Sequence, residues 1–188
     1  MAAVTESPEI VGVFRVVPVA QDDDRGVFVE TFRHEWIPDC RPMIQANRAD
    51  RQTGCVVGLH YHLHQADYWY VPFGRARVVL HDLRSGSPTD GATFVFDLGT
   101  RQDGSHDHGG VYIPPGVAHG FASLTDMTIT YLVDGYYDPD DELGVAWDDP
   151  EIGADWGLSE PVLSGRDALN PARTDLPAHL RPTFGPRP

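Results

Sequence analysis

The sequence predicts an all-β protein, a sandwich or barrel of many short strands. The 19 glycines and 16 prolines interrupt the chain at short intervals. The runs between them are rich in Val, Tyr, Phe, Trp and Thr, the residue types that favour strands. No long stretch repeats its apolar residues with the period of an amphipathic helix.

The predicted strands follow one another between turn signals. Turns are predicted at residues 24–26, 73–74, 85–88 and 114–116, where Gly or Pro interrupts the apolar pattern. The predicted strands cover, in chain order, residues 11–19, 27–32, 43–48, 56–62, 68–71, 75–83, 93–98, 110–113 and 127–133. Short helices are expected at residues 33–37 and 165–169, and the acidic run at 22–24 is expected to be a solvated loop.

The length of 188 residues fits a single domain with a hydrophobic core. We predict one domain over residues 1–170 and a Pro-rich tail over residues 171–188, lying on the surface or on a partner subunit. No apolar run approaches the length of a membrane span, and the N-terminus lacks a basic segment followed by an apolar one. A cytoplasmic protein with no membrane partner is therefore expected.

The composition excludes several classes of function. The net charge of −14 repels phosphate backbones, so a nucleic-acid partner is not expected. All 14 basic residues are Arg, and without Lys the chain has neither a Schiff-base lysine nor a Walker-type phosphate loop. The two cysteines, Cys40 and Cys55, make neither a disulfide scaffold nor a four-sulfur zinc site, and they fit a reducing compartment.

One segment concentrates histidines. His60, His62 and His64 alternate, so on a strand they would share a face, and Asp67 follows a predicted turn. Two histidines at this spacing and a carboxylate can bind one divalent metal ion, and His119 can join them from a neighbouring strand. The alternative is a set of hydrogen-bonded histidines on a barrel wall with no metal.

The spacing of these residues resembles that of two cupin motifs. The first motif runs Gly54-x5-His60-x-His62-x4-Asp67-x6-Gly74, with Asp67 where metal-binding cupins usually have Glu, and the second runs Pro114-x-Gly116-x2-His119. More specifically, residues 10–171 resemble the dTDP-4-dehydrorhamnose 3,5-epimerase family of cupins. The matching stretches include 24–30 (DRGVFVE), 45–47 (QAN), 58–61 (GLHY), 82–89 (DLRSGSPT), 113–121 (IPPGVAHGF), 136–139 (YYDP), 147–150 (WDDP) and 163–167 (LSGRD).

The resemblance implies both fold and activity. The implied fold is a double-stranded β-helix, the cupin jelly roll, with an N-terminal strand extension and a short C-terminal tail of helical or irregular structure. Family members are typically homodimers in which strands of one subunit complete the other's sheet. The implied enzyme is an isomerase that epimerises a nucleotide-activated 4-keto-6-deoxy sugar at C3, C5 or both. It removes a proton, forms an enolate and reprotonates it, and it needs no cofactor.

The resemblance also assigns roles to residues. His60 is implied as the general base, oriented by Asp167, and Tyr131 as the acid on the opposite face of the sugar. A near-neutral base and a donor on the other face are what enolate chemistry requires. The positions implied to bind the nucleotide sugar are Arg25, Phe28, Glu30, Gln45, Asn47, His119, Tyr137, Glu142 and Arg166.

Two positions depart from the family. Val57 replaces an Arg, and Asp67 replaces a Lys that stabilises the enolate. Three explanations follow: Arg48 or Arg51 supplies the charge, a metal held by His60, His62, Asp67 and His119 does so, or epimerisation is lost. A metal-bound His60 could not also be the base. The second hypothesis is therefore a metal-dependent cupin of another reaction type, and the third is a non-catalytic protein that binds nucleotide sugars.

Overall fold

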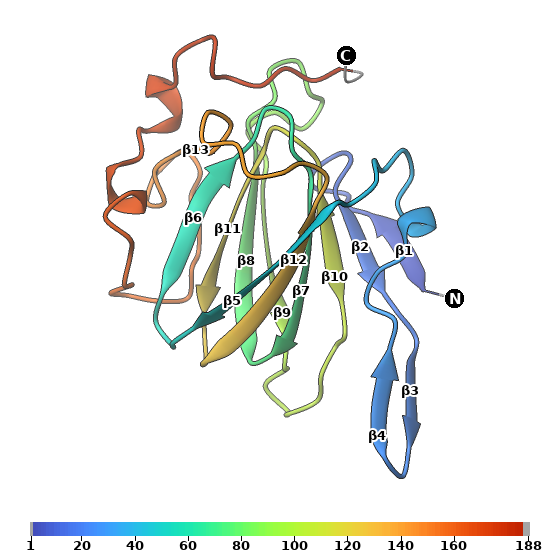
Figure 1. Ribbon diagram of the computed structural model, residues 1–188. Coiled ribbons are helices and arrows are strands. Elements are labelled where there is room, and N and C mark those ends of the chain that lie inside the picture. The colour runs from blue at the N-terminus through green and yellow to red at the C-terminus, as the bar shows by residue number, and fades with distance from the viewer. Residues whose placement is uncertain (1, 186–188) are drawn as a thin grey trace.

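Two antiparallel sheets face each other in the computed structural model, which describes residues 2–185 (Figure 1). The six-stranded sheet has the order β1 (Ala3–Glu6), β2 (Phe14–Val17), β10 (Gly110–Ile113), β7 (Asp67–Phe73), β12 (Met127–Val133) and β5 (Gln45–Arg51). The five-stranded sheet has the order β13 (Leu143–Gly144), β6 (Val56–Tyr61), β11 (Val117–Ser123), β8 (Arg75–Asp82) and β9 (Thr93–Gly99). From β5 to β8 and from β9 to β13, consecutive strands alternate between the two sheets, and the fold is the predicted all-β jelly roll.

The main core lies between the two sheets. Successive side chains of a strand point to opposite faces of the sheet, so one face of every central strand points inward. Trp69 and Val71 from the six-stranded sheet pack with Val78, Leu80 and Phe121 from the five-stranded sheet. The core side chains are less than a tenth exposed, and they hold the two sheets at a fixed separation.

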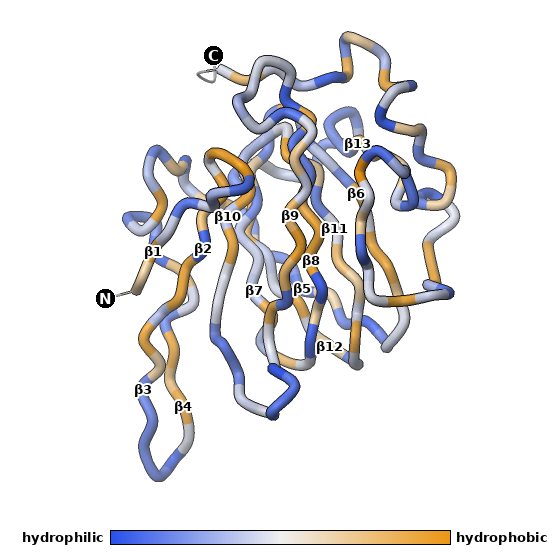
Figure 2. Tube along the Cα trace, turned by 180° about the vertical axis from the view of Figure 1, so that it is seen from behind, coloured by the Kyte–Doolittle hydropathy of each residue, from blue (hydrophilic) through white to orange (hydrophobic). Residues whose placement is uncertain are grey.

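The outer faces of both sheets are also covered. Leu59 and Tyr61 point outward from β6 and pack beneath Val145, Ile152 and Trp156 of the C-terminal segment. The six-stranded sheet is covered in the same way by the segment around η1 (His34–Trp36). Figure 2 shows hydrophobic stretches along the central strands β8 and β9 and a hydrophilic tip on the β3–β4 hairpin.

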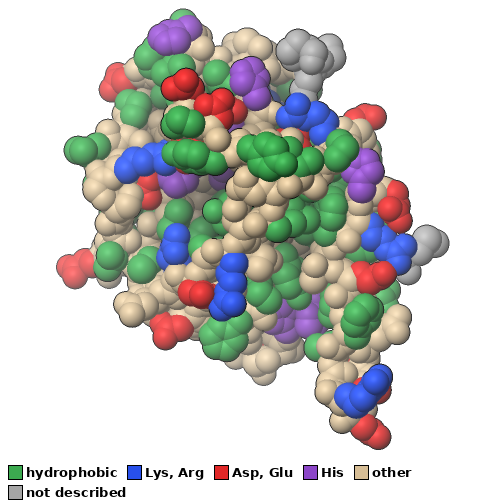
Figure 3. Space-filling view, viewed as in Figure 1, with side chains coloured by type: hydrophobic (Ala, Val, Ile, Leu, Met, Phe, Trp, Pro, Cys, Tyr) green, Lys and Arg blue, Asp and Glu red, His purple; other side chains and the backbone are tan. Residues whose placement is uncertain are grey.

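A separate hairpin leaves the barrel. It consists of β3 (Ala20–Asp23) and β4 (Gly26–Val29), which pair only with each other. In Figure 3 it projects at the lower right with charged side chains at its tip. The prediction of a loop at residues 22–24 was wrong for 22 and 23, because pairing with the apolar strand β4 forms a strand whose residues are all exposed.

The remaining predicted elements have clear outcomes. Every predicted strand overlaps an observed one, and the bounds of β10 and β12 agree fully. Strand β11 was missed, because all its residues are buried and show no alternation. The two expected short helices are the 3-10 helices η1 and η2 (Asp167–Leu169), and a third, η3 (Arg173–Asp175), follows.

The tail packs on the barrel of its own chain. The Tyr61 hydroxyl donates a hydrogen bond to the Leu180 carbonyl at 3.1 Å, and the Ser85 N–H donates to the Pro182 carbonyl at 2.8 Å. No helix within residues 2–185 has the length and apolar character needed to cross a membrane.

Candidate active site

His60 and Asp167 form a hydrogen-bonded pair at the mouth of the barrel. His60 lies on β6 and Asp167 begins η2, yet His60 Nε2 lies 2.6 Å from Asp167 Oδ1. The Asp167 carboxylate also accepts a hydrogen bond from the Gly58 N–H at 3.3 Å. Burial alone would raise the pKa of Asp167, but these hydrogen bonds and the His60 ring lower it below its ordinary value. The carboxylate is therefore ionised at neutral pH and orients the imidazole.

Two glycines let the strands beneath this pair approach closely. A Cβ atom on Gly58 would lie 2.8 Å from both the Cα of Gly120 and the carbonyl oxygen of His119. Gly58 also has a φ of +114°, which L residues rarely adopt. The register of β6 against β11 shifts here, and His60 is paired directly with His119.

Tyr131 comes from the opposite sheet. It lies on β12 and is paired with Asn47 on β5 and with Trp69 on β7. The Trp69 ring meets the His119 ring edge-on, with 5.2 Å between ring centroids, so the two sheets face each other across these side chains. Burial and the carboxylates of Asp67 and Glu142 raise the pKa of Tyr131. The hydroxyl is therefore protonated at neutral pH and has a proton that it could donate.

Glu142 and Arg166 form the rim of the site. Arg166 Nη1 donates to Glu142 Oε2 at 2.8 Å, and Glu142 Oε1 lies 3.7 Å from His62 Nε2. Burial alone would raise the pKa of Glu142, but Arg166 and the neighbouring histidines lower it. On β5, Gln45 Nε2 donates to Asn47 Oδ1 at 2.9 Å. The structure therefore brings these predicted substrate-binding residues to the same region as Tyr131.

Three of the four residues considered for a metal come together without the fourth. His62, Asp67 and His119 are buried, and one donor atom of each lies within 4.8 Å of the others. His60 is paired with Asp167 instead. His64 does not share the face of His60, because β6 ends at Tyr61 and His64 is exposed in the loop that follows.

The structure separates the two arginines that were candidates for the missing positive charge. Arg48 points outward and pairs with Asp50 at 3.0 Å. Arg51 lies on the opposite face of β5 from Arg48. Its positive charge lowers the pKa of Tyr131. Of these two arginines, Arg51 is therefore the one whose charge acts on Tyr131.

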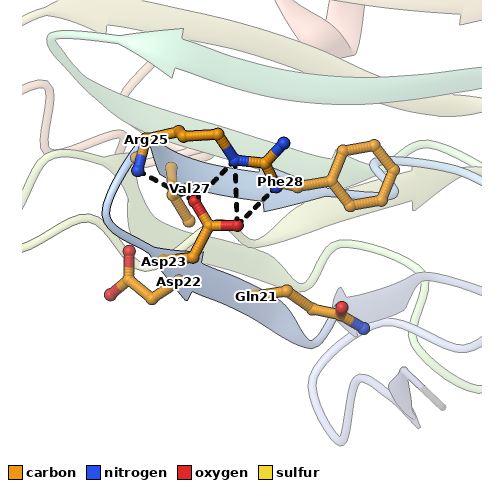
Figure 4. Close-up of a pocket in the computed structure, with 7 residues that line it drawn as sticks. Gln21, Asp22, Asp23, Arg25, Val27 and Phe28 are labelled. Carbon is orange, nitrogen blue, oxygen red and sulfur yellow. Dashed lines mark hydrogen bonds and ion pairs between the residues drawn. The ribbon is translucent and has the colours of Figure 1, made fainter.

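Three predicted substrate-binding residues lie on or beside the hairpin, and a fourth is exposed to solvent. Arg25 and Phe28 belong to the hairpin, which bounds a shallow concavity of about 530 Å³. Figure 4 shows the Arg25 guanidinium folded over the Asp23 carboxylate, with Phe28 extending from β4. Glu30 follows the hairpin and forms an ion pair with Arg33. The fourth residue, Tyr137, follows β12 and is exposed.

Sequence reasoning missed the residues that hold the histidines in place. The Asp141 carbonyl accepts a hydrogen bond from His62 Nδ1 at 2.7 Å, and the Asp141 carboxylate accepts the N–H groups of Leu63 and His64. Trp69 Nε1 donates to Asp67 Oδ2 at 3.0 Å. The run of acidic residues at 138–142 gave a signal for a loop but none for these contacts.

The fold and the site together define a jelly-roll protein with a His–Asp pair at one sheet and a tyrosine on the sheet that faces it. The sequence profile of dTDP-4-dehydrorhamnose 3,5-epimerase matches residues 7–175. The chain therefore belongs to the dTDP-4-dehydrorhamnose 3,5-epimerase family, as the sequence resemblance implied.

Individual relatives agree with this assignment. The chain is 37% identical to a dTDP-4-dehydrorhamnose 3-epimerase of Streptomyces niveus over 84% of this chain and 78% of the relative. It is similar to the crystal structure of a 4-keto-6-deoxy sugar epimerase from the novobiocin gene cluster of Streptomyces spheroides, with a TM-score of 0.87, 33% identity and coverage of 98% and 94% of the two chains. A Legionella pneumophila epimerase in complex with dTDP-4-keto-L-rhamnose gives a TM-score of 0.88 at 28% identity, with coverage of 98% and 100%.

Proposed function

We propose that this chain epimerises a dTDP-linked 4-keto-6-deoxy sugar at C3, at C5 or at both. The observation that carries the proposal is the 2.6 Å pair of His60, on the five-stranded sheet, and Asp167, on η2, with Tyr131 on the sheet that faces His60. The family of the chain and the substrates of the relatives described above support the substrate class.

The proposed reaction exchanges only protons. His60 removes the proton from the carbon beside the ketone, and the electron pair of that C–H bond delocalises onto the carbonyl oxygen as an enolate. The electron pair then returns to the carbon as Tyr131 donates a proton from the opposite face, which inverts the centre. Asp167 keeps the His60 ring in one orientation throughout. No organic or redox cofactor takes part in these steps.

Nucleotide binding is proposed to involve two chains. Glu142, Arg166, Gln45, Asn47 and His119 lie in or next to the site of their own chain. The hairpin residues Arg25, Phe28 and Glu30 instead lie on an element that pairs with no other strand of the barrel. In a homodimer the hairpin of one subunit would place these residues at the site of the other.

The cellular setting is proposed from composition. The chain has only two cysteines, Cys40 and Cys55, too few for a disulfide scaffold, which fits the reducing cytoplasm. The strongly acidic surface favours neither nucleic acid nor an anionic membrane as a partner.

Two variants test the assigned roles. His60→Asn and Tyr131→Phe should each lower turnover of dTDP-4-keto-6-deoxyglucose by about 10²-fold to 10⁴-fold, the usual contribution of a general base or acid. Binding of dTDP, measured by calorimetry, should stay within about twofold, because neither side chain is assigned to the nucleotide. His64→Asn is the matched control, since that histidine is exposed in the loop after β6. Full activity in either catalytic variant would contradict the assigned roles.

A further inference from the structure

Arg51 faces the space between the two sheets at the end of β5. Exposed and partly buried residues alternate along β5, and Arg51 belongs to the partly buried set. It is paired with Met127 on β12, which is 2% exposed and belongs to the core between the sheets. Directly paired residues of antiparallel strands point to the same face of a sheet, so the Arg51 side chain starts on the inner face.

The Arg51 guanidinium has no anionic partner in this chain. With 28 acidic residues and 14 basic ones, most arginines are expected to form ion pairs. Within residues 2–185, only Arg51, Arg75 and Arg101 have no carboxylate oxygen within 4.0 Å of the guanidinium. Arg51 Nη1 donates to the Asp50 carbonyl at 2.9 Å, which is a neutral acceptor. A partly buried cation without a counter-ion is costly unless a ligand supplies the negative charge.

Arg51 and Val57 lie at the same end of the barrel. Arg51 is the last residue of β5 and Val57 is the second residue of β6, and only four residues join the two strands. Figure 1 shows the end of β5 beside the beginning of β6. Val57 packs against the core between the sheets, so it also faces inward. An arginine at either position would therefore present its guanidinium to the same part of the interior.

The position of the missing lysine is at the other end of β5. Asp67, where the family resemblance places that Lys, is paired with Val133 on β12, and Gln45 of β5 is paired with the same residue. Gln45 and Arg51 are the two ends of β5, about 20 Å apart at the usual rise of a strand, which is more than an arginine side chain spans. Arg51 therefore makes up for the absent arginine and not for the absent lysine.

The inner face of β5 leaves room for the Arg51 side chain. The next inward residue is Ala49, whose side chain is a single methyl group, and after it comes Asn47, which is paired with Tyr131. The guanidinium can therefore extend along the strand toward the tyrosine. Burial and two nearby carboxylates raise the pKa of Tyr131, and the charge of Arg51 lowers it.

We propose that Arg51 binds the diphosphate of the nucleotide sugar, in place of the arginine that the family resemblance puts where Val57 stands. This inference rests on the proposed function for the identity of its ligand. In a dTDP-linked 4-keto-6-deoxy sugar the permanent negative charges lie on the diphosphate, whereas the ketone is neutral. A guanidinium is a planar fork that donates two parallel hydrogen bonds to phosphate oxygens, and no carboxylate competes for this one.

Calorimetry with dTDP tests the binding role without any turnover. Arg51→Gln should bind dTDP about 10-fold to 100-fold more weakly, the usual effect of losing a charge-assisted hydrogen bond. Arg51→Lys should recover part of the affinity, because it keeps the charge but not the fork geometry. Arg48→Gln is the matched control and should bind like the parent protein, since Arg48 is exposed and paired with Asp50 on the other face of the same strand. Circular dichroism confirms that each variant is folded.

Exchanging the two side chains tests the relocation of the charge. Val57→Arg added to Arg51→Val should bind dTDP at least about tenfold more tightly than Arg51→Val alone, because both side chains start on the inner face at the same end of the barrel. A purely structural Arg51 would not be rescued by a cation on the opposite sheet. No gain in affinity in the exchanged variant would overturn the proposal.

Steady-state kinetics separate the diphosphate from the enolate as the partner of Arg51. Arg51→Gln should raise KM about as much as it weakens dTDP binding, with kcat within about threefold of the parent value. A loss in kcat with unchanged dTDP affinity would overturn the proposal, because it would assign the charge to the enolate.

The same measurements distinguish this proposal from the proposed function. Weaker dTDP binding by Arg51→Gln, in a protein that epimerises no sugar, would support the role of Arg51 and overturn the epimerase function. An active epimerase in which Arg51→Gln binds dTDP like the parent protein would overturn the role of Arg51 alone.

Discussion

Asp167 and Asp67 are both buried carboxylates, yet their partners give them different roles. Asp167 lies 2.6 Å from an imidazole nitrogen and is stabilised as an anion by the Gly58 N–H and by His60. Asp67 receives neutral donors from Gln65 and Trp69 and faces two histidine rings at longer distance. The first arrangement orients the proposed base, whereas the second fixes the Asp67 carboxylate through two neutral donors.

The contact between His60 and Asp167 predicts what happens when the Asp167 carboxylate is replaced by a neutral amide. Asp167→Asn should lower kcat by about 10²-fold to 10⁴-fold, because an amide does not stabilise the imidazolium that forms on proton removal. The affinity for dTDP should change little. Asp148→Asn is the control, since Asp148 is exposed and forms no hydrogen bond among residues 2–185. Steady-state kinetics of both variants provide the measurement, and equal kcat values would contradict the role of Asp167.

Strands also carry titratable groups that serve the fold rather than the site. His81 lies on β8 and is fully buried, with Nδ1 2.9 Å from Thr93 Oγ1. The Thr93 hydroxyl donates to the Ile152 carbonyl, so it accepts the hydrogen of His81 Nδ1. Burial and the nearby Arg173 lower the pKa of His81 to about 4. Three carboxylates act in the opposite direction, those of Asp82, Asp149 and Asp90.

Because His81 on β8 is buried, the free energy of unfolding should depend on pH. Between pH 6.5 and about 4 the unfolded chain binds a proton at this position and the folded chain does not, so the free energy of unfolding falls as pH falls. Going from pH 7 to pH 5, this single group lowers it by about 2 kcal/mol. Urea unfolding of the parent protein and of His81→Gln at the two pH values measures the effect. Between pH 7 and pH 5, His81→Gln should lose about 2 kcal/mol less stability than the parent protein. Equal losses in the two proteins would rule out a buried, neutral His81.

In the molecule as a whole, the hairpin is the part whose packing a single chain does not complete. An isolated two-stranded hairpin is marginal in water, and this one exposes Val19, Val27 and Phe28 to 53% or more. The proposed homodimer covers these side chains and brings Arg25 to the partner's site. The apolar face and the nucleotide-binding role then have a common explanation.

The dimer predicts a change of mass on mutation of the hairpin. The parent chain of 20.8 kDa should sediment as a dimer, and Val27→Glu combined with Phe28→Glu should shift it toward the monomer. Charged side chains at these positions would have to be buried without partners in the interface. Val162→Glu, at a site that is 64% exposed on another part of the surface, is the control and should remain dimeric. A monomeric parent protein, or a dimeric double variant, would contradict this arrangement.

The local pattern of the sequence predicted most of the strands but not all of them. Strands with clear apolar runs, such as β10 and β12, were predicted with their observed bounds. Strand β11 was missed because it is buried on both faces and contains Gly120, which breaks the apolar pattern.

The site was predictable only in part for a related reason. Alternation places His60 and His62 on one face of the predicted strand, but it does not indicate that Asp167, 107 residues later, reaches His60 and not His62. That pairing was expected from the family resemblance alone. The backbone carbonyls that hold His62 and His119 depend on tertiary packing, which no local pattern encodes.

The most direct measurement of the central claim is proton NMR in deuterated water. The protein is incubated with dTDP-4-keto-6-deoxyglucose while the signals of the sugar C3 and C5 protons are followed. Loss of one or both signals at catalytic protein concentration is predicted, and the position lost identifies the centre that His60 deprotonates. Persistence of both signals over hours, with dTDP shown to bind, would contradict enolate formation and with it the proposed epimerase function.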